Sequence, residues 1–208
     1  MLSHAKRLFR INEQLLAIYI EYIDVKIKDN EMKGTNCFFT LLFIGTLFAS
    51  CDKSDMNYEN SFEKSYDKWL SFKETSGNSY RYTVTGSTWV GPAWQTVITV
   101  TKGKITQRDF KFTSTGGYDV PQEALEWTEN ENEINLHKDT PAAAALTLDQ
   151  IYDKGRNEWL IKRKNTKAYF EANNNGLMSL CGYIEDACAD DCFNGISIAY
   201  IEPLSTVI

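Results

Sequence analysis

From residue 61 onward, the spacing of apolar residues switches between a helical period and a strand period. Apolar side chains recur every three or four residues from Ser61 to Lys73, and Gly77-Asn78 follows, so we predict a first helix there. A second helix is predicted after Thr147, because Thr147-Leu148-Asp149-Gln150 has the sequence of a capping box. Gly155 is expected to weaken the middle of this second helix.

Seven further segments carry the pattern of strands. In the first, Tyr80, Tyr82 and Val84 alternate with polar residues, which is the period of two of a half-buried strand. Lys102-Gly103-Lys104 and Asn173-Asn174-Asn175-Gly176 have the composition of tight turns. The predicted strands, of which the fourth has the weakest pattern, cover residues 80–85, 94–101, 105–113, 133–137, 166–172, 177–184 and 194–201.

The order of these elements defines the expected fold class. A helix precedes four strands, and a second helix precedes three more, mostly with connections of hairpin length. Short connections favour antiparallel pairing between successive strands. The sequence therefore predicts one α+β domain over residues 61–208, in which a mostly antiparallel sheet has two helices packed on one face.

The stretch from Met32 to Cys51 has the layout of a bacterial lipoprotein signal peptide. Lys33 supplies a positive charge, residues 37–48 form a nearly unbroken apolar run, and small residues precede Cys51 in a pattern that resembles a lipobox. The run is shorter than the roughly 20 residues of a membrane span. We therefore predict a signal peptide over residues 32–50 and lipidation of Cys51, although Phe48 is larger than the residue usual three positions before the cysteine.

This signal peptide determines how the rest of the chain is divided. Residues 1–31 precede a complete signal that has its own methionine, so we expect an over-called start codon and translation from Met32; a genuine cytoplasmic extension is the alternative. Residues 51–60 are polar and aperiodic, which predicts a flexible tether. The mature chain of 158 residues (208 minus 50) suits a single domain.

Composition limits the expected partners. From Asp52 onward the chain has 16 Lys and Arg against 23 Asp and Glu, a formal charge of −7. Because nucleic-acid binding requires a basic patch, we expect no nucleic-acid partner. Aromatic residues are frequent and can mark a surface that binds sugar or peptide, but in a β-rich domain they more often fill the core.

Four short motifs resemble a small family of bacterial exported domains of unknown function. They are Tyr80-Arg81-Tyr82 after a tryptophan-bearing helix, the hairpin at Val100–Lys104, the helix start at Thr147, and two C-terminal strands around an Asp-Asp loop. The resemblance covers about Ser65 to Leu204. It implies the fold and export, and it implies no activity.

Residues 181–192 combine three cysteines with four carboxylates. Exported proteins meet an oxidising compartment, so we expect one disulfide among Cys181, Cys188 and Cys192. All three pairings are open, and a bond from Cys181 to either of the others would staple the hairpin. This disulfide is the leading interpretation of the segment.

The alternative interpretations of this segment are metal binding and catalysis. Calcium is the most plausible metal, with oxygen ligands from Glu185, Asp186, Asp190 and Asp191, although their spacing matches no EF-hand. Zinc is disfavoured because His137, the only histidine of the mature chain, is distant in sequence. A catalytic cysteine would need that same histidine as a base.

Two functions follow from these patterns. The first is a non-enzymatic lipoprotein of the cell envelope, anchored through lipid to the outer membrane on its periplasmic or surface face, which binds a protein or glycan partner without a cofactor. The second is a small hydrolase or a calcium-binding domain that uses residues 185–191. We favour the first, because no carboxylate pair has a recognisable catalytic setting and histidine is nearly absent.

Overall fold

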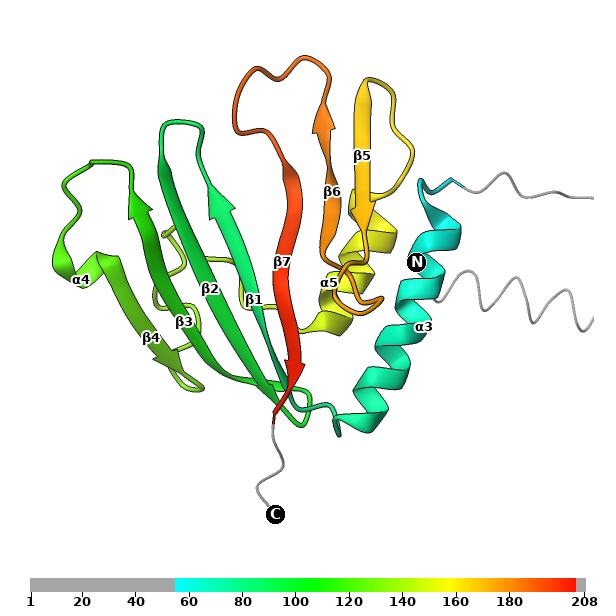
Figure 1. Ribbon diagram of the computed structural model, residues 1–208, viewed down its shortest axis with the longest axis horizontal. Coiled ribbons are helices and arrows are strands. Elements are labelled where there is room, and N and C mark those ends of the chain that lie inside the picture. The colour runs from blue at the N-terminus through cyan, green and yellow to red at the C-terminus, as the bar shows by residue number, and fades with distance from the viewer. Residues whose placement is uncertain (1–54, 205–208) are drawn as a thin grey trace, which may run out of the picture. The chain divides into compact units, whose positions relative to one another are not determined.

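The computed structural model describes residues 55–204, which form one antiparallel sheet with helices (Figure 1). The signal peptide, Cys51 and most of the predicted tether lie outside the described residues. The helices are α3 (Glu59–Thr75), α4 (Gln122–Leu125), α5 (Leu148–Lys154) and the π-helical turn η1 (Gly155–Trp159). The strands are β1 (Tyr80–Ser87), β2 (Pro92–Thr101), β3 (Lys104–Thr115), β4 (Glu126–Asn130), β5 (Thr166–Glu171), β6 (Leu180–Glu185) and β7 (Asn194–Pro203). None of the helices described is long and apolar enough to cross a membrane.

The sheet has the strand order β4-β3-β2-β1-β7-β6-β5, and every neighbouring pair is antiparallel. The predicted α+β class with an antiparallel sheet is therefore confirmed. The first and last strands, β1 and β7, lie side by side in the middle of the sheet (Figure 1). The sheet thus consists of a sequential half, β1 to β4, joined to a second half, β5 to β7.

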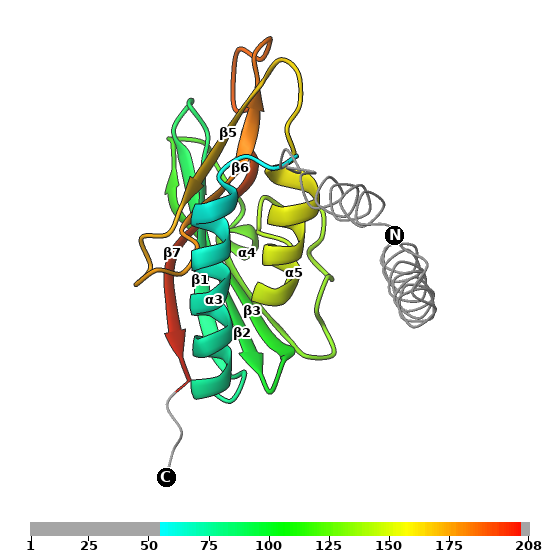
Figure 2. The same cartoon turned by 90° about the vertical axis from the view of Figure 1, so that its right-hand side faces the viewer.

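The long helix α3 and the shorter α5 lie on the same face of the sheet (Figure 2). Between them and the sheet is a core rich in aromatic side chains, in which Trp69 of α3 packs edge-on against Tyr80 of β1, with ring centroids 5.2 Å apart. The Tyr80 hydroxyl accepts the N–H of Leu148 at the start of α5. Both helices are therefore fixed to the first strand.

The start of α5 has the predicted capping box. The Thr147 hydroxyl accepts the N–H of Gln150, and the Gln150 side chain accepts the N–H of Thr147. Gly155 does not end the helix, which continues as η1 to Trp159. A Cβ at Gly155 would lie 2.9 Å from the Phe62 ring and 3.2 Å from Cys181 Sγ, so glycine allows the close packing of η1 against α3 and β6.

The predicted strand at residues 133–137 is wrong, and the strand of this region is β4, at residues 126–130. The buried Glu129 of β4 explains the error. Its carboxylate accepts the N–H groups of Asn135 and His137, so residues 131–137 fold back over it as turns. Asn135 adopts a positive φ of 78°, which a strand does not contain.

Candidate functional site

The two central strands are paired over only part of their length. The β1–β7 ladder runs from Tyr80, opposite Pro203, to Val84, opposite Ile198, and stops there. Beyond this point Thr85–Ser87 pair with β2, whereas Asn194–Ser197 pair with β6. The two strands diverge toward the β1–β2 hairpin (Figure 1), and we call this opening the fork.

A cavity of about 1020 Å³ occupies the fork. Its walls are the ends of β1 and β7, the crossover segment 141–146 that leads to α5, the helical residues Lys154 and Trp159, and the loop before β7. We call it the fork cavity. Its volume is at the upper end of the range of about 300 to 1,000 Å³ that is usual for ligand pockets in proteins.

Two indole rings contribute to the apolar surface of the fork cavity, beside aliphatic residues such as Leu146 and Ile196. Trp94 of β2 lies against Gly86 of β1, where a Cβ would come within 2.6 Å of the indole, so glycine at this position lets the ring lie flat on the strand. Trp159 of η1 is 9% exposed and lies beneath Lys154, whose Nζ is 5.6 Å from the ring centroid. A bound apolar group would therefore contact aromatic faces held in place by the fold.

The charged side chains that line the fork cavity are Lys154 and Asp191, and both have partners. Lys154 pairs with Glu158 one helical turn away. Asp191 Oδ1 accepts the backbone N–H of Trp89, 3.2 Å away, across the open end of the fork. In addition, the hydroxyl of Thr88 is buried in this wall without a hydrogen-bond partner. The lining is therefore apolar with a few hydrogen-bonding groups.

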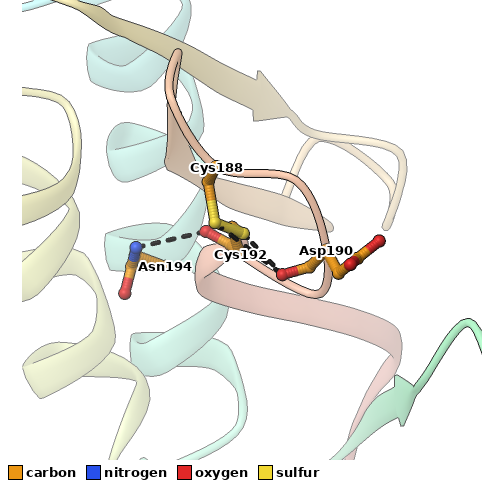
Figure 3. The surroundings of a disulfide bond; sticks show 4 residues. All are labelled: Cys188, Asp190, Cys192 and Asn194. Atoms are coloured by element: carbon orange, nitrogen blue, oxygen red, sulfur yellow. Dashed lines mark hydrogen bonds between the residues drawn. A yellow bond between two sulfur atoms is a disulfide. The ribbon is translucent and has the colours of Figure 1, made fainter.

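The cysteine-rich loop forms one edge of this site. Cys188 and Cys192 form a disulfide with Cα atoms 6.1 Å apart, and both Sγ atoms face the carbonyl oxygen of Asp190 (Figure 3). The predicted disulfide therefore lies within the loop, and a pairing that uses Cys181 is wrong. Cys181 lies on β6 opposite Ile196 and faces the core, whereas the other two lie beyond the strand end.

Cys181 is a buried free thiol with no exposed surface. Burial raises its pKa to about 12. Such a thiol stays protonated at neutral pH and is a poor nucleophile. It is also far from a histidine across the sheet, because His137 contacts Glu129 of β4, and four strands separate β4 from β6. Within residues 55–204, the structure thus brings no Cys–His pair together.

The four acidic candidates, Glu185, Asp186, Asp190 and Asp191, are exposed in and beside the disulfide loop. Within residues 55–204, no three His, Cys, Asp or Glu side chains converge on a point where they could hold a metal ion. The geometry therefore gives no support to the calcium alternative. Of these four, only Asp191 lines the fork cavity.

A second polar cluster lies at the other side of the sheet, and sequence reasoning missed it. Arg108 of β3 and Glu129 of β4 are 2% and 0% exposed and approach to 2.9 Å, in an ion pair. Nε of Arg108 lies within ion-pair distance of the Glu129 carboxylate but makes no hydrogen bond. Nη2 of Arg108 donates a hydrogen bond to Oε1 of Glu129. The His137 ring stacks on Trp127 and contacts the same carboxylate.

This cluster is structural. Desolvation raises the pKa of Glu129, but hydrogen bonds from His137, Asn135 and Arg108 together lower it below its ordinary value. Arg108 also donates to the carbonyl of Ala143, and the N–H of Ala143 donates to Thr96. These bonds hold the crossover segment on the sheet, and that segment is one wall of the fork cavity.

These features define a protein class: an α+β domain with one antiparallel sheet, helices on one face, and a fork cavity between its first and last strands. Comparisons with protein-family models, curated proteins and solved structures found no match to this chain.

Proposed function

We propose that this protein is a non-enzymatic, lipid-anchored protein of the bacterial cell envelope that binds a ligand in the fork cavity. The observation that carries the binding role is the cavity itself, at about 1020 Å³. It combines a mostly apolar lining with a few fixed polar groups, which is the usual character of a ligand site. The fork cavity is open in the structure as it stands, without any rearrangement of side chains.

Two features support the envelope location. The lipobox-like sequence ending at Cys51 predicts a lipid anchor, and several acyl chains together give stable attachment, at about 0.8 kcal/mol per buried methylene. The disulfide between Cys188 and Cys192 is of the kind that persists in oxidising compartments. The two features are independent, because one belongs to the signal segment and the other to the folded domain.

The chemistry of the lining supports binding rather than catalysis. A general acid–base mechanism needs a titratable group free to exchange a proton with the substrate. The lining has a single carboxylate, Asp191, whose Oδ1 accepts the Trp89 N–H, and its lysine, Lys154, is paired with Glu158, so it offers no pair of carboxylates for acid–base catalysis. Among the described residues that line the fork cavity there is no histidine, and the one cysteine, Cys192, is in the disulfide.

Site-specific photocrosslinking in the living cell tests this proposal. A benzophenone amino acid is placed at Ser87, which is exposed and lines the fork cavity, and separately at Lys104, which is exposed at the far end of the same half of the sheet. We expect light-dependent adducts of discrete mass at Ser87 and not at Lys104. Equal labelling, or none, at both positions would contradict a ligand site in the fork.

A further inference from the structure

We propose that the disulfide between Cys188 and Cys192 is a redox-reactive site that controls the entrance to the fork cavity. In its oxidised form the disulfide holds Asp191 in position to accept the N–H of Trp89, and reduction by a dithiol partner releases this hydrogen bond. The inference rests on the proposed binding function, since it regulates access to the same site. It follows from the place of Asp191 inside the ring that the disulfide closes.

The ring holds Asp191 in an uncommon backbone conformation. Cys188 and Cys192 are four positions apart in sequence, and Asp191 directly precedes Cys192. Asp191 has a positive φ of 45°, in the left-handed region. Aspartate enters this region more readily than most residues, but it is still uncommon outside glycine. A closed ring of this size restricts the conformations of the residues inside it, so the disulfide favours this geometry of Asp191.

Other restraints on Asp191 are few. The backbone N–H groups of residues 189–191 donate no hydrogen bond to any other residue that the structure describes. The loop is fixed instead at its two ends. The N–H of Cys188 donates to the carbonyl of Glu185, and the Phe193 ring packs edge-on against Tyr169 of β5, with centroids 6.4 Å apart. Between these ends, the position of Asp191 depends on the disulfide.

Asp191 connects two walls of the fork cavity. Thr88, next to Trp89, lines the cavity from the β1–β2 hairpin, and Asp191 and Cys192 line it from the disulfide loop. Among the described residues, the bond from Trp89 to Asp191 is the one hydrogen bond between residues 88–91 and residues 186–193. Loss of this bond therefore allows the two walls to separate at the entrance.

The disulfide is accessible to a reductant. Cys188 is exposed, whereas Cys192 is half-buried (Figure 3). Exposed disulfides are the labile ones, whereas structural disulfides resist reduction. Cys181 does not compete for the two sulfurs, because it is buried in the core and its pKa, raised to about 12, keeps it protonated. The redox pair therefore consists of Cys188 and Cys192.

The exchange transfers two electrons from the dithiol to the disulfide. A thiolate of the dithiol attacks Sγ of Cys188, the bond between Cys188 and Cys192 breaks, and Cys192 leaves as a thiolate. The second thiolate of the partner then attacks the mixed disulfide, so the partner closes its own disulfide and Cys188 leaves as a thiolate. The two protons of the dithiol end on Cys188 and Cys192. The partner is oxidised and the loop is reduced.

Reduction leaves the fold in place. The ring covers only residues 188–192, and a disulfide that closes so short a loop adds little to stability. The β6–β7 ladder joins residues 180–183 to residues 194–197, outside the ring. The change is therefore confined to the loop and to its bond with Trp89. In the oxidising compartment proposed above, the bonded form is the resting state.

The first measurement asks whether the disulfide exchanges in the folded protein. The mature protein is treated with dithiothreitol without denaturant, and a maleimide reagent of known mass counts the free thiols. We expect two labelled thiols, at Cys188 and Cys192, and an unlabelled Cys181. If neither loop cysteine is labelled until the protein is unfolded, the disulfide is an inert cross-link and the inference is overturned.

Hydrogen–deuterium exchange then tests the effect on the entrance. We expect reduction to speed exchange of the Trp89 amide by about two- to tenfold, the factor that corresponds to loss of one exposed hydrogen bond. Amides in the middle of the sheet should exchange at an unchanged rate. Equal exchange at residues 88–91 in the oxidised and reduced protein would overturn the inference.

A matched pair of variants shows whether the disulfide acts through Asp191. Asp191→Ala lacks the acceptor, so reduction should have no further effect on exchange at Trp89. Asp190→Ala keeps the acceptor inside the same ring, and reduction should act on it as on the wild type. If Asp191→Ala responds to dithiothreitol as the wild type does, the disulfide acts by another route and the inference fails.

A double variant, Cys188→Ser with Cys192→Ser, reproduces the open state without a reductant. We expect exchange at Trp89 to equal that of the reduced wild type and not to respond to dithiothreitol. An unchanged melting temperature, measured against the reduced wild type, shows that the variant is folded. Exchange equal to that of the oxidised wild type would contradict a role for the disulfide.

The crosslinking experiment at Ser87 separates this inference from the proposed function. Adducts at Ser87 together with unchanged exchange on reduction would overturn this inference and leave the ligand site. Faster exchange on reduction without adducts would support redox release of the loop and overturn the ligand site. Where both are seen, we expect a higher adduct yield in the double serine variant, because its entrance is open. Equal yields would overturn control of the entrance.

Discussion

The backbone N–H of Trp89 donates a hydrogen bond to Oδ1 of Asp191, 3.2 Å away, although 102 residues separate them in sequence. The bond joins the β1–β2 hairpin to the disulfide loop across the open end of the fork cavity. Its acceptor is held on a loop cross-linked by the disulfide between Cys188 and Cys192. The bond therefore links two loops that would otherwise move separately at the entrance to the site.

Removing this acceptor should loosen both loops without unfolding the domain. We expect Asp191→Ala to speed amide hydrogen exchange at residues 88–91 and 186–193, because an exposed hydrogen bond contributes only about 0.5 to 1.5 kcal/mol and the core is untouched. Hydrogen–deuterium exchange with mass spectrometry measures this. Asp190→Ala is the control, since the Asp190 carboxylate makes no such bond. Equal exchange in the two variants would show that the bond does not hold the loops.

The disulfide can be checked directly by mapping non-reduced peptides. We expect one bridge between Cys188 and Cys192 and a free Cys181 that reacts with iodoacetamide only after unfolding, because its thiol is buried and its pKa is raised to about 12. Reduction should lower stability by no more than about 2 kcal/mol, since the closed loop is short. A bridge from Cys181 to either loop cysteine would contradict this arrangement.

Calcium provides a separate test of the same loop. We expect millimolar calcium to leave the melting temperature of the mature domain unchanged, because the acidic side chains of residues 185–191 do not converge on a common point. Thermal unfolding with calcium and with a chelator measures the difference. A marked rise in melting temperature with calcium, absent in Asp190→Ala, would restore the calcium-binding interpretation.

Local patterns along the chain predicted much of the fold. The period of two in Tyr80, Tyr82 and Val84 identified β1, and the capping box at Thr147 identified the start of α5. Both signals arise from contacts between residues that are near in sequence or from one-sided burial. β4 was missed because Glu126, Glu129 and Asn130 give it a polar sequence. Its buried Glu129 is tolerated through partners that no local pattern reveals, above all Arg108.

The fork cavity could not be predicted for a related reason. It exists because the pairing of β1 with β7 stops at Val84 and Ile198, and these residues are 114 positions apart (198 minus 84). Gly86 and Gly195 are visible in the sequence, but the close contacts that require glycine appear only when Trp94 and Cys181 are in place. The disulfide pairing was left open for the same reason, since it depends on where β6 ends.

The buried pair of Arg108 and Glu129 should be important for stability. Removing one partner from a buried ion pair typically costs about 3 to 5 kcal/mol, because the other charge is left unpaired. We expect Glu129→Gln to lose stability in this range in urea unfolding. The double variant Arg108→Met with Glu129→Leu should recover part of the loss. If the free energy of unfolding of Glu129→Gln lies within about 0.5 kcal/mol of the wild-type value, the pair does not have a stabilising role.

The same pair should make the domain sensitive to acid. Hydrogen bonds hold the pKa of Glu129 below its ordinary value of 4.5, so the unfolded chain binds a proton at higher pH than the folded one. This contribution is present above the unfolded pKa and is lost as the pH falls through the folded pKa. Stability measured from pH 6 downward should therefore fall below about pH 4.5, less steeply in Glu129→Gln. Parallel curves for the two proteins would assign the acid sensitivity to other groups.

The lipid anchor is a prediction from sequence alone, because Cys51 lies outside the described residues. We expect a clickable fatty acid to label the protein made in its own host, and Cys51→Ala to lose the label and leave the membrane fraction, because the thiol is the attachment site. Cys188→Ala is the matched control, since it removes a different exported cysteine and should keep the label. Equal labelling of wild type and Cys51→Ala would show that the anchor is elsewhere.

The start site is tested by Met32→Leu, which should abolish most expression if translation starts at Met32. Undiminished export of Met32→Leu would favour a genuine extension over residues 1–31.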